Sequence, residues 1–163
     1  MDTAQDTIEI EQLSDDELGE TFIRACRVRD QQSLFIARCA AEMAKREKHD
    51  DDGFVSPIDW LRFNGHMTSG AAANSVVVGE SIKRMPESME AMAAGEIGFA
   101  HLTVMARTAE DLGDRFDESV LIQKAREKRL ASFTTSARTI AMRPTLSGLL
   151  MRRRRRSSSA GSS

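Results

Sequence analysis

Apolar and small side chains recur three or four residues apart along most of this chain, which is the spacing of one face of an α-helix. The longest such run follows Ser14 and contains no Pro or Gly between Glu20 and Asp52. It predicts one helix of about 30 residues, roughly 45 Å long, and Ser14 with Glu17 predicts a capping box at its start. The predicted apolar stripe consists of Leu18, Phe22, Cys26, Ser33, Ile36, Ala40 and Met43.

A series of shorter helices is predicted over residues 57–109, where Gly65, Pro86 and Gly95 interrupt the helical pattern. These breaks divide the segment into two pairs of helices, and each pair is joined by a short turn that contains Gly. Helix-turn-helix modules that bind DNA share this arrangement with ordinary helical cores.

Local signals place several helix ends. Ser56 precedes a Pro at the first helical position, Thr68 precedes an Ala-rich segment, and Asp117 begins a charged helix. Gly113 is expected to end the helix before that one. Ser132 is expected to cap the last helix.

The predicted fold is all-α: a long N-terminal helix followed by a bundle of short helices with helix-turn-helix-like pairs. The domain covers residues 14–143, between a disordered leader (1–13) and a disordered Arg/Ser-rich tail (144–163). Hydrophobic residues make up 40% of the chain and aromatic residues only 5%, with nine Met and no Tyr. This composition favours helices that pack closely on small side chains.

The two cysteines, Cys26 and Cys39, lie too far apart along the predicted helix to form a disulfide with each other. The chain shows neither a signal peptide nor a long apolar run. We therefore expect reduced core thiols in a cytoplasmic protein that has no membrane partner.

The net charge of −2 is unevenly distributed. All 25 acidic residues precede residue 150 together with 18 of the 23 basic ones, which gives that part a charge of −7; the other five basic residues are Arg152 to Arg156. An acidic body is electrostatically unfavourable for DNA, because neutralisation of phosphates supplies most non-specific affinity.

Motifs for catalysis are absent from the sequence, which has no nucleophile elbow, phosphate loop or dinucleotide fingerprint. The acidic turn from Asp50 to Gly53 lacks the remaining ligands of a calcium loop, so solvated charge is the better interpretation. Trp60 is expected to be a core anchor. We therefore expect no enzyme activity, no cofactor, no metal and no small-molecule substrate.

The run from Trp60 to Thr108 resembles the bacterial domain of unknown function 222, also called the 13E12 repeat family. The resemblance covers about residues 14–142, and its most specific part is Ala94-Gly95-Glu96-Ile97 followed by His101. Many members carry this domain in front of a His-Asn-His endonuclease domain, so the resemblance implies a role beside DNA cleavage.

The chain departs from that family in two respects. It stops where the nuclease domain would follow, and His49, His66 and His101 do not form a nuclease motif. Members tend to place arginines in the Ala-rich helix, where this chain has Ala73 and Asn74. The expectation is a truncated or split form without the nuclease part.

The leading hypothesis for function is a non-catalytic, DNA-associated module. Ser69 and Asn74 would face base edges, since Asn pairs with adenine and Ser contacts several bases. The other candidates are cations: Arg62, Lys83 and Arg84 for phosphates, with Arg107 continuing a basic stripe. His101 is expected either to contact phosphate, to act as a pH-sensitive group, or to be a half-buried residue satisfied by a neighbour.

The alternative is a helical homo-oligomerisation or protein-interaction module without a nucleic-acid role. In that case the long N-terminal helix is the working surface, and a homodimer forms through it. A contiguous basic stripe through Arg62, Lys83, Arg84 and Arg107 would favour DNA, whereas an exposed apolar seam within residues 18–43 would favour assembly.

Overall fold

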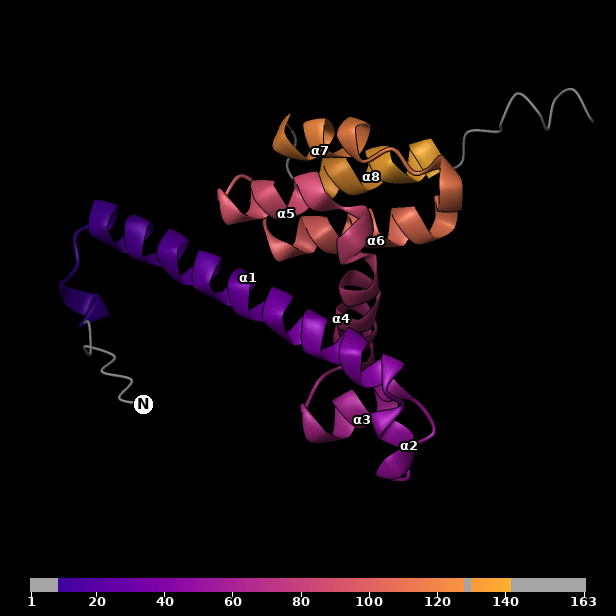
Figure 1. The fold of residues 1–163 in the computed structure, drawn as a ribbon. Coiled ribbons are helices and arrows are strands. Elements are labelled where there is room, and N and C mark those ends of the chain that lie inside the picture. Colours follow the sequence, from indigo (N-terminus) through magenta and orange to yellow (C-terminus); the bar gives the residue numbers. More distant parts are fainter. Residues whose placement is uncertain (1–8, 128–129, 142–163) are drawn as a thin grey trace, which may run out of the picture.

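The computed structural model describes residues 9–127 and 130–141, which form helices and no strands (Figure 1). The all-α fold with a long first helix is therefore confirmed. The helices are α1 (Asp15–Lys45), α2 (Lys48–Asp51), α3 (Pro57–Asn64), α4 (Ser69–Ser81), α5 (Pro86–Ala93), α6 (Phe99–Leu112), α7 (Glu118–Glu127) and α8 (Leu130–Ala141). Short 3-10 turns cover Ile10–Gln12, Ile82–Arg84 and Gly113–Arg115.

Most predicted caps are confirmed. The Ser14 side chain accepts from the Glu17 amide, and the Glu17 carboxylate accepts from the Ser14 amide at 2.9 Å. Ser56 caps α3 ahead of a Pro in its first turn, and Thr68 caps α4. Ser132 is not a cap, because α8 already begins at Leu130 and places Ser132 in its first turn.

Helix α4 lies at the centre of the fold. It crosses the C-terminal half of α1 at close range, with Gly79 directly against the Ala37 carbonyl. At one end of α4 lie α2 and α3, and at the other end lie α5 to α8 (Figure 1). A small core of Ala40, Leu61 and Ala72 fills the first end.

The main core lies among α4, α5, α6, α7 and α8. Its largest fully buried side chains include Phe133, Met85, Leu102, Met105 and Leu121. This core also contains Ala37 of α1. Methionine and alanine thus fill positions that aromatic residues occupy in many other cores, as the composition indicated.

Some predictions about local structure are wrong in whole or in part. In the predicted stripe of the long helix, Ala40 is buried and Cys26, Ser33 and Met43 are partly covered, whereas Leu18, Phe22 and Ile36 are exposed. Cys39 is exposed and Cys26 only partly covered, so they are not core thiols. The aspartates of the acidic turn are exposed, as expected for solvated charge, but they belong to a short helix and to Asp52, whose carboxylate accepts from the Trp60 indole at 2.6 Å.

Predictions for the two ends of the chain fall mostly outside the described residues. Of the predicted leader, residues 10–12 form a 3-10 turn. Residues 1–8 and the predicted tail, 144–163, are not among those described.

Candidate interaction surface

The first half of α1 has little contact with the rest of the described chain. Within residues 15–29 only Thr21 and Cys26 are partly covered, and all the other residues are exposed. We call this segment the arm. Figure 1 shows it extending past the other helices. At 1.5 Å per residue the arm is roughly 22 Å long, and its helical conformation continues from the half of α1 that α4 anchors.

Large apolar side chains are concentrated on the exposed side of α1. The described part of the chain exposes ten large hydrophobic side chains, and six of them belong to this helix. Phe22 and Phe35 are 67% and 62% exposed, so the surface is apolar in both halves of the helix. The six are Leu18, Phe22, Ile23, Val28, Phe35 and Ile36.

Most of these side chains follow one helical seam. Leu18, Phe22, Ala25 and Val28 are spaced four, three and three residues apart, and all four are exposed. Phe35, Ile36 and Cys39 continue the same side of the helix. We call these seven residues the outer face of α1. Burying each large apolar side chain would contribute about 1.5–3 kcal/mol, so this face is a candidate surface for an apolar partner.

The motif Ala94-Gly95-Glu96-Ile97, between α5 and α6, lies where α1 meets the other helices. Gly95 has a φ of +76° and ends α5, and an added Cβ there would lie 2.9 Å from Nε of Arg27 in α1. Glu96 pairs with Arg126 of α7 at 2.6 Å, and Ile97 is buried in the main core. The motif therefore joins α1, α7 and the core, and this packing gives it a structural role.

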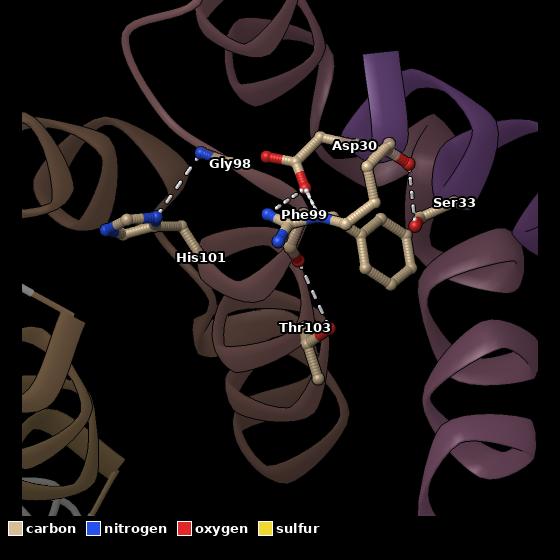
Figure 2. Close-up of polar contacts among 7 residues, drawn as sticks. Asp30, Ser33, Gly98, Phe99, His101 and Thr103 are labelled. Carbon is tan, nitrogen blue, oxygen red and sulfur yellow. Dashed lines mark hydrogen bonds and ion pairs between the residues drawn. The ribbon is translucent and has the colours of Figure 1, made fainter. Parts of the chain in front are cut away.

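Asp30 of α1 faces the beginning of α6 (Figure 2). Its side chain is only 15% exposed, and its Oδ2 lies 2.5 Å from the position that a Cβ on Gly98 would take. Arg29 donates to Oδ1 of Asp30 at 2.8 Å. A carboxylate at this place is stabilised by the positive end of the α6 dipole.

Sequence reasoning missed Asp30. A signal was nevertheless present, because Asp30 falls between Cys26 and Ala37 at helical spacing, on the side of α1 that faces the rest of the fold.

His101 is half-buried and hydrogen-bonded to a neighbour, which is one of the three roles predicted for it from the sequence. Its Nδ1 accepts from the Gly98 amide at 3.3 Å (Figure 2), and its ring lies 5.7 Å from that of Phe133. Burial lowers the pKa of His101 below the ordinary value of 6.5, although the nearby Asp30 carboxylate opposes the shift.

Acidification is expected to destabilise the fold through His101. In the unfolded chain the imidazole takes up its proton near pH 6.5, whereas in the folded protein it does so only at lower pH. The contribution of the His101 side chain to the free energy of unfolding is thus fully present above pH 6.5, and it is lost as the pH falls through the depressed pKa. Urea unfolding between pH 7.5 and 5.5 should show a smaller decline for His101→Gln than for the unsubstituted protein. The exposed His66→Gln is the control, and equal declines in all three proteins would contradict this role.

The predicted DNA-contacting residues do not form one open surface. Arg84 donates to the Ala109 carbonyl at 3.1 Å and to the Gly113 carbonyl, and its guanidinium lies 5.6 Å from the centre of the Phe116 ring. Arg84 therefore satisfies the last carbonyls of α6. Arg62 pairs with Asp59 of its own helix at 3.1 Å.

Two of the predicted residues do lie together. Arg107 of α6 donates to Oδ1 of Asn74 in α4 through Nε and Nη2, at 3.1 and 2.6 Å. Lys83 is exposed in the turn after α4, and Ser69 is exposed at the opposite end of that helix.

The middle of α4 is covered by its neighbours. Of its residues only Ser69, Gly70 and Glu80 are exposed, because α1, α3 and α6 all pack against it. A recognition helix needs an open face several turns long to enter the major groove, and α4 does not present one. DNA contact by Ser69 and Asn74 stays a prediction, and this packing counts against it.

The described residues give few other indications of chemistry. A cavity of about 260 Å³ between α1 and the Gly95–His101 segment is lined partly by Cys26, Arg27 and Asp30. Within residues 9–127 and 130–141, no three His, Cys, Asp or Glu side chains are grouped to hold a metal ion. Over the same residues no helix has both the length and the apolar character needed to cross a membrane.

No protein-family model, curated protein or solved structure matches this chain. The resemblance to the domain of unknown function 222 therefore stays a hypothesis.

Proposed function

We propose that this chain is a non-catalytic helical assembly module whose working surface is the outer face of α1. The observation that supports this most directly is the exposure of Phe22, Phe35 and Ile36 on a helix whose other side is anchored against α4. Contiguous exposed apolar side chains on a folded domain are typical of surfaces that bind another protein.

The arrangement of the cations supports the same choice. Arg62, Arg84 and Arg107 each bind a group of the chain itself, so they do not form the unpaired basic stripe that DNA binding would favour. Together with a charge of −7 over the first 150 residues, this makes a nucleic-acid surface the weaker explanation.

DNA association is the second candidate, because Asn74 and Arg107 meet at the surface between α4 and α6. An electrophoretic shift assay with duplex DNA at low salt tests it. An unshifted duplex at tens of micromolar protein would contradict it.

Assembly through α1 is expected to be concentration-dependent and to be lost when the outer face is made polar. In sedimentation velocity the unsubstituted chain should form a larger species as its concentration rises. A variant carrying Phe22→Ser, Phe35→Ser and Ile36→Ser should remain monomeric, because each substitution removes apolar area that only a partner would bury. Its helicity should be unchanged, since these side chains are exposed.

The matched control is a variant with exposed apolar residues replaced elsewhere. Val55→Ser and Phe63→Ser remove side chains that are 92% and 70% exposed but not on α1, and this variant should associate like the unsubstituted chain. A monomer at about 100 μM for the unsubstituted chain would refute the proposed function.

A further inference from the structure

The arm carries its charges in two separate groups. Its first turns hold Asp15, Asp16, Glu17 and Glu20, and its last turns hold Arg24, Arg27 and Arg29. The exposed seam of Leu18, Phe22, Ala25 and Val28 runs through both groups, and Phe22 lies between them. A second arm that runs in the opposite direction would therefore meet opposite charge at both ends and apolar side chains in the middle.

The charges beside the seam also match in position. Asp15 and Arg29 lie seven residues before and after Phe22, so they share its edge of the seam, whereas Glu17 and Arg24 lie beyond the opposite edge, next to Val28. In an antiparallel pair with two-fold symmetry, each flank faces the same flank of the partner. Crossing near Phe22 then places Asp15 beside the partner's arginine at position 29, and Glu17 near its arginine at position 24. Arg29 already pairs with Asp30 of its own chain at 2.8 Å, but its side chain is 68% exposed, so a second carboxylate can reach it.

A parallel pair would place like charges together. The four carboxylates of one arm would lie beside the four of the other, and the arginines would face arginines, which costs stability. The antiparallel pair also keeps the bulk of each copy away from the other. Each arm leads into its own bundle at its C-terminal end (Figure 1), so the two bundles lie at opposite ends of the paired arms.

We propose that the arm of α1, residues 15–29, binds the same arm of a second copy in antiparallel orientation, with the crossing at Phe22. This inference rests on the proposed function and specifies the partner, the segment and the orientation. The partner is a second copy of this chain because the charges of one arm are complementary to those of another arm that runs in the opposite direction.

The first test separates the arm from the rest of the outer face. Sedimentation equilibrium of the full chain should give a dimer, and Phe22→Ser should raise its dissociation constant by at least about 30-fold, because the side chain lies at the centre of the interface in both copies. The matched variant Phe35→Ser lies beyond the arm and should change it by less than about 3-fold.

The second test concerns orientation. Raising ionic strength from about 0.05 to about 0.5 M should weaken an antiparallel dimer, by about 5–10-fold, and would strengthen a parallel one. Asp15→Lys and Arg29→Glu should each weaken the dimer. The chain with both substitutions should recover it, because a lysine at position 15 then faces a glutamate at position 29 of the partner.

Different failures have different meanings. An association that survives Phe22→Ser but is lost in Phe35→Ser would overturn the arm pair and leave assembly through α1 intact. A dimer that strengthens with salt, or a charge-swapped chain that fails to recover, would overturn the antiparallel orientation. A strictly monomeric chain would overturn both proposals.

Discussion

Replacing Gly79 with alanine is expected to lower the free energy of unfolding by about 2–3 kcal/mol. An added Cβ would lie 2.1 Å from the Ala37 carbonyl oxygen and 2.7 Å from the Ala41 Cβ. The first of these atoms belongs to the backbone of α1, so it can move only if the whole helix moves. Separating α1 from α4 would loosen the contacts around the buried Ala37 and Ala40. That loss exceeds the roughly 1 kcal/mol that alanine gains over glycine within a helix.

Gly70 supplies a matched control in the same helix. An added Cβ there has no atom within 4 Å, so Gly70→Ala should leave stability unchanged or raise it by up to about 0.5 kcal/mol. Urea unfolding followed by helical circular dichroism measures both variants. If the two alanine variants had the same stability, the close crossing of α1 and α4 would be refuted. The crossing also matters for the proposed assembly, because it holds the second half of α1 and leaves the arm projecting.

The helix boundaries were the most predictable part of this fold, since their signals are local. Ser14 with Glu17, Ser56 before a Pro, and Thr68 all cap the helices that they were expected to begin. In each case a side-chain oxygen satisfies an amide within three residues along the chain. The Ser132 prediction failed because α8 starts two residues earlier, at Leu130.

The buried side of α1 could be predicted only in part from its apolar pattern. Its contact with α4 is made by alanines, which allow close approach but add little to a hydrophobic periodicity, whereas the large Phe22 and Phe35 are exposed. A pattern weighted by side-chain size therefore mixes the two sides of the helix, as in the predicted stripe, where Ala40 is buried and Phe22 is exposed. Helix α1 thus has two apolar sides. Its small residues pack against α4, and its large residues are available to the partner proposed above.

The predicted nucleic-acid residues illustrate a different difficulty. Arg84 binds carbonyls 25 and 29 residues away, and Arg107 binds Asn74, 33 residues away. Nothing in the local sequence around an arginine shows whether its charge is already used in such distant contacts. The sequence therefore shows where the arginines are, but only the tertiary structure shows whether they are free to bind phosphates.

Replacing Glu118 with alanine is expected to destabilise the fold by about 2–4 kcal/mol. Oε1 of Glu118 in α7 accepts from the amide and from the hydroxyl of Ser88, at 2.7 and 2.6 Å. Ser88 is fully buried in the first turn of α5, and Met85 provides no side-chain cap for that helix. Glu118 thus acts as the missing cap from another helix, and its negative charge also suits the positive end of the α5 dipole.

Two variants separate the hydrogen bonds from the charge. Glu118→Gln keeps an acceptor oxygen and loses the charge, so its destabilisation should be about half that of Glu118→Ala. Glu110→Ala, at an exposed carboxylate on α6, should stay within about 0.5 kcal/mol of the unsubstituted chain. Urea unfolding of the three variants decides the matter, and a Glu118→Ala protein as stable as Glu110→Ala would show that α5 does not depend on this cap. Because Glu118 and Ser88 lie outside the arm, the Glu118 variants should retain concentration-dependent association as long as they remain folded. Their loss of stability should therefore be separable from the loss of assembly expected for Phe22→Ser.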